Sequence, residues 1–317
     1  MAKSILAIDI GGSSVKSCIL SCTPESFEIN IRYSAVKLPS NDFSDLNEIV
    51  CELVSKALMD VTDISAIGIS TTGSVDNQGT VISAGHFNGY VNVSWKEILM
   101  SVHNSIEEVV VLNDGRASAW AEYEANEENV SSHVHVVVGT GVGGGLIYKD
   151  ELLQGDSGQA GYIGHLKISS GKTAVCSCGN MGCVEALAAA PAISGHYNSL
   201  EKEESSISFE DVVNLASDNN PNAIQAIELG GYYLGVGLGN AMNVLNPSQV
   251  TVGGGVLVAS EKVLDEDGQE VYFSAISKGI KFAAHKRVFA AIKFRKAKYG
   301  NDGGMIGAAL LTYRKIS

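Results

Sequence analysis

Residues 133–148, HVHVVVGTGVGGGLIY, carry the pattern that decides the fold. An apolar run, a glycine-rich turn and a second apolar run predict a β-hairpin. Residues 4–20, SILAIDIGGSSVKSCIL, repeat the same plan of strand, glycine turn and strand. Residues 139–144 also satisfy the G-x-G-x-x-G pattern of dinucleotide-binding folds, but extended structure follows them where that fold needs a helix. Two such hairpins in one chain predict two similar α/β halves that face each other across a cleft.

Composition and charge restrict the class of protein. The chain has 317 residues, 45% hydrophobic and 18% charged, which is typical of a globular enzyme of two domains or one large one. A net charge of −13 argues against a nucleic-acid partner. No apolar run approaches the roughly 20 residues of a membrane span. We therefore expect a cytoplasmic protein without a membrane partner.

A cysteine-rich stretch at residues 160–190, AGYIGHLKISSGKTAVCSCGNMGCVEALAAA, predicts a metal site. It contains His165, Cys176, Cys178 and Cys183. One histidine and three cysteines form a closed tetrahedral zinc site. Two alternatives are loop thiols without a metal and a disulfide. The second needs an oxidising compartment, and the N-terminus shows no secretory signal.

The turn of the first hairpin is a candidate anion site. Gly11, Gly12, Ser13 and Ser14 follow a buried strand, and such a turn aims backbone N–H groups and hydroxyls at an anion. Asp9, just before the turn, is placed to hold Mg²⁺ through water. Lys16 is either a solvated strand lysine or an electrostatic partner of the bound anion.

A second carboxylate lies at the end of a predicted strand. Residues 109–112 form this strand, and they deliver Asn113 and Asp114 to its end, ahead of an alanine-rich helix. A carboxylate in this position suits a general base. The alternative is a helix N-cap, a role open to either residue.

Other patterns complete the α/β layout. Helices are expected at 46–61, 207–217 and 221–244, the last with a glycine-rich face that permits close packing. A buried strand at 250–252 ends in three glycines, which allow the backbone to approach a flat ligand.

Several of these motifs resemble those of the ROK family, which comprises bacterial sugar kinases and sugar-responsive repressors. The sequence from Gly164 to His165, followed by CSCGNMGCVE at 176–185, resembles the family signature. DIGGSSVK at 9–16 resembles its first phosphate motif, with Ser13 where Thr is usual, and Asn113-Asp114 resembles its Asn-Asp pair. The resemblance covers nearly the whole chain.

The resemblance implies a two-domain, actin-like ATPase (ribonuclease H-like) α/β fold with duplicated topology. Residues 1–120 would form the N-terminal domain and residues 121–302 the C-terminal domain with the zinc loop. The last helix, about 303–317, would pack back on the first domain. Family members are commonly dimers, so a homodimer is expected.

The implied activity is transfer of the ATP γ-phosphate to a hexose or hexoside hydroxyl, the 6-hydroxyl being favoured, with Asp114 as general base. The sugar would be bound by Asn88 (or Asn92, since the register is loose), Asn113, Tyr162, His165 and Glu185. ATP and Mg²⁺ would be bound by Asp9, Gly11, Gly12, Ser13, Ser14, Lys16, Thr140, Gly141, Gly143, Gly253, Gly254 and Gly255. Structural Zn²⁺ would be held by His165 and the three cysteines.

Two departures from the family pattern stand out. Tyr162 occupies a position where Glu is usual, and His165 lies about one residue further from Cys176, which we interpret as a loop insertion. Family repressors carry a helix-turn-helix ahead of the first phosphate motif, whereas only eight residues precede Asp9 here. This favours a kinase over a sugar-sensing regulator, and the presence of Asp114 disfavours a non-catalytic sugar-binding protein.

Overall fold

The computed structural model describes residues 2–125, 130–169, 175–202 and 207–317. The chain divides into two compact units. The first comprises Met1–Glu127, Leu152–Gly161 and Asp302–Ser317, and the second comprises Glu128–Glu151 and Tyr162–Asn301.

This division differs from the expected one at the first boundary, which follows Glu127 and not residue 120, and at residues 152–161, which belong to the first unit. The Asn77 side chain donates hydrogen bonds to the carbonyls of Gly155 and Asp156 at 2.7 and 3.0 Å. The Ser74 hydroxyl donates to Gln159 Oε1 at 2.8 Å. These long-range contacts are not visible in the local sequence pattern, which explains the difference at residues 152–161.

The first unit is built on a mixed sheet that contains the first predicted hairpin. Its strand order is β3 (Phe27–Arg32), β2 (Ser14–Cys22), β1 (Lys3–Ile10), β5 (Ile64–Thr71) and β9 (Glu108–Asn113), with β4 (Val36–Lys37) also paired to β2. Strands β1 and β2 are antiparallel, whereas β5 and β9 run parallel to β1. The carboxyl ends of β1, β5 and β9 therefore meet at one edge of the sheet.

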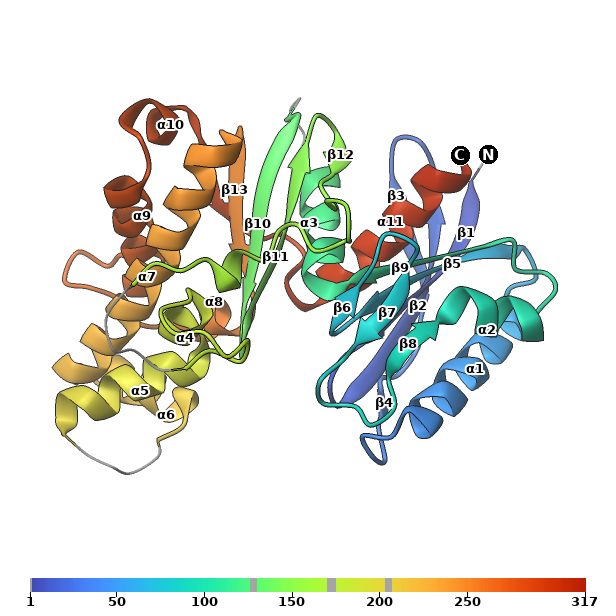
Figure 1. Cartoon of the computed structure of the whole chain (residues 1–317), viewed down its shortest axis with the longest axis horizontal. Helices are drawn as coiled ribbons and strands as arrows, with labels where there is room; N and C mark the ends of the chain where they lie inside the picture. The colour runs from blue at the N-terminus through green and yellow to red at the C-terminus, as the bar shows by residue number, and fades with distance from the viewer. Residues whose placement is uncertain (1, 126–129, 170–174, 203–206) are drawn as a thin grey trace. The chain divides into compact units, whose positions relative to one another are not determined.

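Helices cover both faces of this sheet (Figure 1). Helix α1 (Phe43–Asp60) buries a stripe that includes Leu46 and Val50 against Leu6 and Ile8. Helix α11 (Gly303–Ile316) packs on the opposite face and against α3 (Asp114–Glu124). A small sheet of β6 (Ser74–Val75), β7 (Thr80–Ser83) and β8 (Val91–Ser94), together with α2 (Trp95–Val102), completes the unit.

Helix α11 approaches its neighbours closely because glycines stand at the contacts. A Cβ atom at Gly307 would lie 1.7 Å from the carbonyl oxygen of Ala117 in α3. A Cβ atom at Gly68 of β5 would lie 2.5 Å from the carbonyl of Ala308. The last helix is thus packed closely against α3 and against the face of the sheet at β5.

We predict that Gly307→Ala destabilises the protein, because the backbone of α3 must move to admit the methyl group. The expected loss is about 2 kcal/mol or more in the free energy of unfolding, measured by chemical denaturation. Gly195→Ala is the matched control. Gly195 is also helical, and a Cβ there meets nothing within 4 Å, so this variant should be as stable as the wild type or more so. Equal stabilities for the two variants would contradict the packing described.

The second unit repeats the sheet plan of the first. Its order is β12 (Glu151–Leu152), β11 (Val142–Tyr148), β10 (Ser132–Val138), β13 (Gln249–Gly253) and β14 (Lys293–Lys296). Strands β10 and β11 form an antiparallel hairpin, and β13 and β14 continue parallel to β10. The expected duplicated topology is confirmed.

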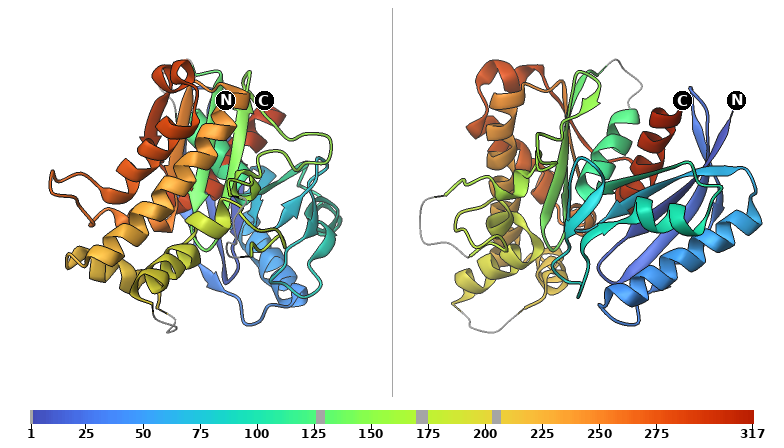
Figure 2. Two further views of the ribbon diagram at one scale, coloured as in Figure 1. Left: turned by 60° about the vertical axis from the view of Figure 1, so that its left-hand side comes forward. Right: turned by 45° about the vertical axis from the view of Figure 1, so that its right-hand side comes forward.

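Helices of the second unit pack closely, as the glycine-rich face at 221–244 predicts. Helix α7 (Pro221–Leu245) lies beside α9 (Val271–Ala283), as Figure 2 shows. A Cβ atom at Gly235 would lie 2.1 Å from the carbonyl oxygen of Ile276. The remaining elements are η1 (Ile163–His165), α4 (Glu185–Ala188), α5 (Ala190–Glu201), α6 (Phe209–Ser217), α8 (Gly255–Ser260), α10 (Lys286–Ala291) and η2 (Gly300–Asp302).

Candidate functional site

Asn113 and Asp114 have distinct structural roles at the end of β9. The Asn113 side chain is the N-cap of α3, accepting from the N–H groups of Gly115 and Arg116 at 3.1 and 3.4 Å. Its amide donates to the carbonyl of Gly73 at 2.9 Å and to Asp114 Oδ1 at 2.9 Å. The hydrogen bonds described for the Asp114 carboxylate, from the Asn113 amide and the Gly115 N–H, are both made to Oδ1, and Oδ2 is the oxygen that can act on a ligand.

The pKa of the Asp114 carboxylate is closer to neutral pH than that of an ordinary aspartate. Burial of the carboxylate raises the pKa of Asp114 to about 6. Hydrogen bonds from the Gly115 backbone and from Asn113 lower the pKa, and the charge of Asp9 raises it further. A base with this pKa is ionised at pH 7 and still basic enough to accept a proton from a hydroxyl that is being attacked.

Asp9 lies at the end of β1 beside the start of α11. The Ser70 hydroxyl donates to Asp9 Oδ1 at 2.8 Å, and Lys16 Nζ lies 3.8 Å from Oδ2. A Cβ atom at Gly304 would lie 2.6 Å from Ser70 Oγ and 3.1 Å from Asp9 Oδ1. Burial raises the pKa of Asp9, while Ser70 and Lys16 lower it. A divalent cation would keep this carboxylate ionised, so the donor chemistry suits Mg²⁺.

The first glycine turn lies next to His86, a residue that the sequence reasoning missed. A Cβ atom at Gly12 would lie 3.0 Å from ring atoms Cδ2 and Nε2 of His86. Thr72 Oγ1, in the loop after β5, lies 3.3 Å from the same Nε2. No local pattern marks His86, because the fold brings it to the turn from residues 84–92.

Asn88, the favoured sugar ligand of residues 84–92, is tied to another loop. Its side-chain amide donates to Asp42 Oδ1 at 2.9 Å, and its backbone bonds to Asn41 and Phe43. The residue is exposed, as is Asn92, which adopts a positive φ of 53°. A sugar contact from either asparagine stays a prediction.

In the second unit, the two predicted nucleotide motifs lie on neighbouring strands. The turn at residues 139–141 follows β10, and Gly253 ends the adjacent parallel strand β13, with Gly254 and Gly255 directly after it. Gly254 has a φ of 98°, and a Cβ there would lie 2.3 Å from the carbonyl oxygen of Val138. The backbone of one motif therefore packs directly on the strand that carries the other.

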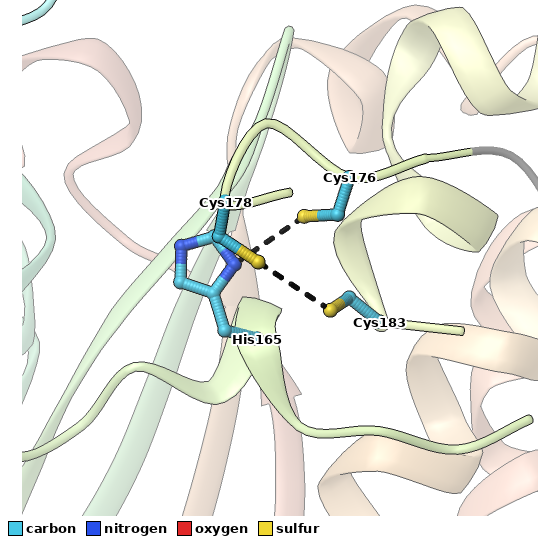
Figure 3. A group of neighbouring side chains, drawn as sticks. All are labelled: His165, Cys176, Cys178 and Cys183. Carbon is cyan, nitrogen blue, oxygen red and sulfur yellow. Dashed lines mark hydrogen bonds between the residues drawn. The ribbon is translucent and has the colours of Figure 1, made fainter. Parts of the chain in front are cut away.

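The four predicted zinc ligands converge (Figure 3). The ligand atoms of His165, Cys176, Cys178 and Cys183 all lie within 4.8 Å of one another. His165 Nδ1 is 3.5 Å from Cys176 Sγ, and the sulfurs of Cys178 and Cys183 are 3.8 Å apart. A tetrahedron with Zn–S bonds of about 2.3 Å and a Zn–N bond of about 2.0 Å has N–S edges of roughly 3.5 Å and S–S edges of roughly 3.8 Å. The His165–Cys176 and Cys178–Cys183 separations match these edges, and all six cysteines of the chain are free thiols.

The loop around these ligands is built for a tight turn. Gly179 and Gly182 have φ values of 84° and 82°, and a Cβ at Gly182 would lie 2.0 Å from the carbonyl oxygen of Ser169. The Asn180 side chain donates to Cys178 Sγ at 3.4 Å, and such an outer hydrogen bond would orient this ligand. The proposed insertion lies between His165 and Cys176, a segment of which residues 170–174 are outside the described part of the chain.

His165 and Tyr162 form a second face of the same site. Figure 3 shows the Nδ1 side of the His165 ring facing the sulfurs and the other ring nitrogen turned away from them. The Tyr162 ring packs edge-on against the His165 ring, with 5.7 Å between centroids, and 43% of the residue is exposed. His165 can therefore serve a metal with one nitrogen and a ligand with the other.

Glu185 lies between the second glycine turn and the segment at 175–183 that carries the three cysteines, called here the cysteine loop. Its Oε1 accepts from the Ser177 hydroxyl at 2.5 Å and from the Cys176 thiol at 3.4 Å. Its Oε2 accepts from the N–H of Val142 at 3.1 Å. The family resemblance places Glu185 at the sugar, and no local sequence pattern indicates these partners.

Ser70 and Asp302 also escaped the sequence reasoning. Asp302 at the start of α11 makes a bidentate ion pair with Arg32 of β3, at 2.9 and 3.0 Å, and its charge raises the pKa of Asp9. The one sequence feature that indicates them is the pair of glycines at 303–304, because glycines allow α11 to pack closely against its neighbours.

Comparison with known proteins identifies the family of the chain. The sequence profile of the ROK family matches residues 5–315. A glucokinase of Halalkalibacterium halodurans is 27% identical over 332 residues, covering 96% of this chain and 94% of its own length. A xylose repressor of Bacillus subtilis is 31% identical, but that match covers 65% of this chain and 52% of the repressor.

A solved structure agrees with the sequence comparison. The ROK hexokinase of Thermus thermophilus superposes with a TM-score of 0.83 at 25% identity, covering 99% of both chains. Within the part of the chain that the structure describes, no helix has the length and apolar character to cross a bilayer.

Proposed function

This chain belongs to the ROK family and is a sugar kinase of actin-like fold, and from that premise we propose that it transfers the γ-phosphate of ATP to the 6-hydroxyl of a hexose or hexoside. The observation that carries the proposal is the exposed carboxylate of Asp114 at the carboxyl end of β9, held through Oδ1 by the Asn113 amide and the Gly115 N–H. Phosphoryl transfer depends mainly on positioning and charge neutralisation, with a base to accept the hydroxyl proton.

Each predicted ATP ligand has a role in this proposal. Asp9 would hold Mg²⁺ through water, with Lys16 beside it to balance charge. The turns at Gly11–Ser14 and Thr140–Gly143 would bind the phosphates through backbone N–H groups, and Gly253–Gly255 would lie against the adenosine. Asn113 is assigned to holding Asp114, because its amide hydrogen atoms and its oxygen already bond to protein atoms.

We assign structural Zn²⁺ to His165, Cys176, Cys178 and Cys183, whose ligand-atom separations fit a tetrahedron. Bound zinc would stabilise the loop and fix the His165 ring, and it would take no part in phosphoryl transfer. His165, oriented in this way, would present its second nitrogen to a sugar hydroxyl. The homodimer and the cytoplasmic location stay predictions.

The alternative function is a sugar-sensing regulator, and the similarity to the xylose repressor supports it. The kinase relative matches along nearly its whole length, and the repressor along about half. A coupled assay for ADP release, run with hexoses, N-acyl hexosamines and disaccharides, separates the two. A kinase turns over with at least one of these sugars, whereas a regulator binds sugar without turnover.

We predict that Tyr162 shifts preference from free glucose to a substituted hexose such as a β-glucoside. A carboxylate, usual at this position in the family, accepts strongly from two hydroxyls, whereas a phenol offers one weak acceptor and an apolar face. Tyr162→Glu should move the ratio of kcat/KM values toward free glucose by about tenfold, which corresponds to one charge-assisted hydrogen bond. A wild type that prefers free glucose, with an unchanged ratio in the variant, would disprove this role.

A further inference from the structure

The carboxylate of Glu185 connects two segments that carry different parts of the proposed site. On one side, Oε1 accepts from Ser177 of the cysteine loop at 2.5 Å. On the other, Oε2 accepts at 3.1 Å from the backbone N–H of Val142, the first residue of β11 directly after the second glycine turn. Hydrogen bonds to an ionised carboxylate are about twice as strong as neutral ones. The bridge lies entirely within the second unit.

Gly141, in the second glycine turn, makes the contact with Glu185 possible. A Cβ atom at Gly141 would lie 2.7 Å from Glu185 Oε2, so any side chain there would displace the carboxylate. Gly141 thus has a packing role besides any role toward phosphate. Glu185 therefore constrains the backbone of the turn at Gly141 and Val142.

Two further contacts fix the same turn to the metal-site segments. A Cβ atom at Gly164, next to His165, would lie 2.1 Å from the carbonyl oxygen of Val142, so η1 packs directly on β11. After α4, the N–H of Ala190 donates to the carbonyl of Gly139 at 2.9 Å. The turn is therefore held at three points by residues that flank the metal ligands.

We propose that Glu185 is a positioning residue that couples the cysteine loop to the second glycine turn, so that an ordered loop is required for tight nucleotide binding even without sugar. This inference rests on the proposed function, which assigns the turn to the phosphates of ATP. In a purely sugar-binding role, Glu185 would affect sugar affinity alone.

The test measures the dissociation constant of Mg-ADP by calorimetry, on zinc-loaded protein in the absence of sugar. Glu185→Ala should weaken ADP binding by about tenfold, because the Val142 N–H loses its acceptor and the turn is released. Glu185→Gln should stay within about twofold of the wild type. Its amide oxygen can accept from Val142, and its NH₂ group can donate to Ser177 Oγ.

Ser177 supplies an independent arm, since it is exposed and is not a proposed ligand of metal, sugar or nucleotide. Ser177→Ala should weaken ADP binding by about threefold, and Ser177→Thr should restore it. In the Glu185→Ala background, Ser177→Ala should have no further effect, because the bridge is already broken. Zinc content and Tm are measured for each variant, and Ser177→Ala carries the test if Glu185→Ala does not fold.

The outcomes separate the inference from the proposed function. Wild-type ADP affinity in both alanine variants, or fully additive effects in the double variant, would overturn the coupling. A wild-type protein that binds no Mg-ADP at all would overturn the proposed function instead.

Discussion

Asp114→Asn should lower kcat by about 10²-fold or more while sugar affinity changes little. The asparagine keeps the size of the side chain and can accept from Gly115, but it cannot accept the hydroxyl proton, and general-base catalysis typically contributes this much. Steady-state kinetics with the best sugar, together with sugar binding by calorimetry, measure the two effects. The matched control is Glu107→Gln, because Glu107 is an exposed acid just before the opposite end of β9.

The pH profile gives a second readout of the same residue. Because the pKa of Asp114 is raised to about 6, the carboxylate is ionised above that pH and protonated below it. Wild-type kcat/KM should therefore be level above pH 7 and fall about tenfold per unit below pH 6. The residual activity of Asp114→Asn should lack this fall. An Asn variant with near-normal kcat would place the base elsewhere.

Cys178→Ser should abolish zinc binding and lower activity by at least about tenfold. The wild-type protein should contain about one zinc per chain, since four ligands close one tetrahedral site. With a ligand lost, the loop no longer fixes His165, and changes in ligand support typically cost 10- to 100-fold in activity. Metal analysis by mass spectrometry, Tm and sugar KM report the three consequences.

Cys51→Ser is the matched control for this change. Cys51 lies in α1 of the first unit, apart from the ligand cluster, and is only partly buried. This variant should keep its zinc and its activity. A metal-free wild type with full stability and activity would contradict the role given to the site.

Local patterns predicted those features that depend on neighbouring residues. The strand–glycine–strand plan at 4–20 and 133–148 predicted both hairpins, and the observed sheets repeat one order around them. The His-Cys₃ spacing predicted a ligand cluster that the fold brings within 4.8 Å. In each case turn geometry and side-chain type act over a few residues, so the sequence carries the information directly.

Features that depend on distant contacts were not predictable in this way. His86 reaches Gly12 only because the loop at 84–92 folds over the end of β1. Asn88 is held by Asp42, and Glu185 by Val142, each more than 40 residues away. Residues 152–161 join the first unit through Asn77 and Ser74, which no periodicity in either segment reveals.

Identification of the reaction product shows whether this chain phosphorylates a hexose with ATP. The protein is incubated with Mg-ATP and the panel of sugars, and the products are analysed by mass spectrometry and phosphorus NMR. We predict stoichiometric formation of ADP and a hexose or hexoside 6-phosphate, which Asp114→Asn does not form at a comparable rate. If Mg-ATP and sugar both bind to the zinc-loaded protein and no phosphorylated sugar forms, the protein is not a hexose kinase.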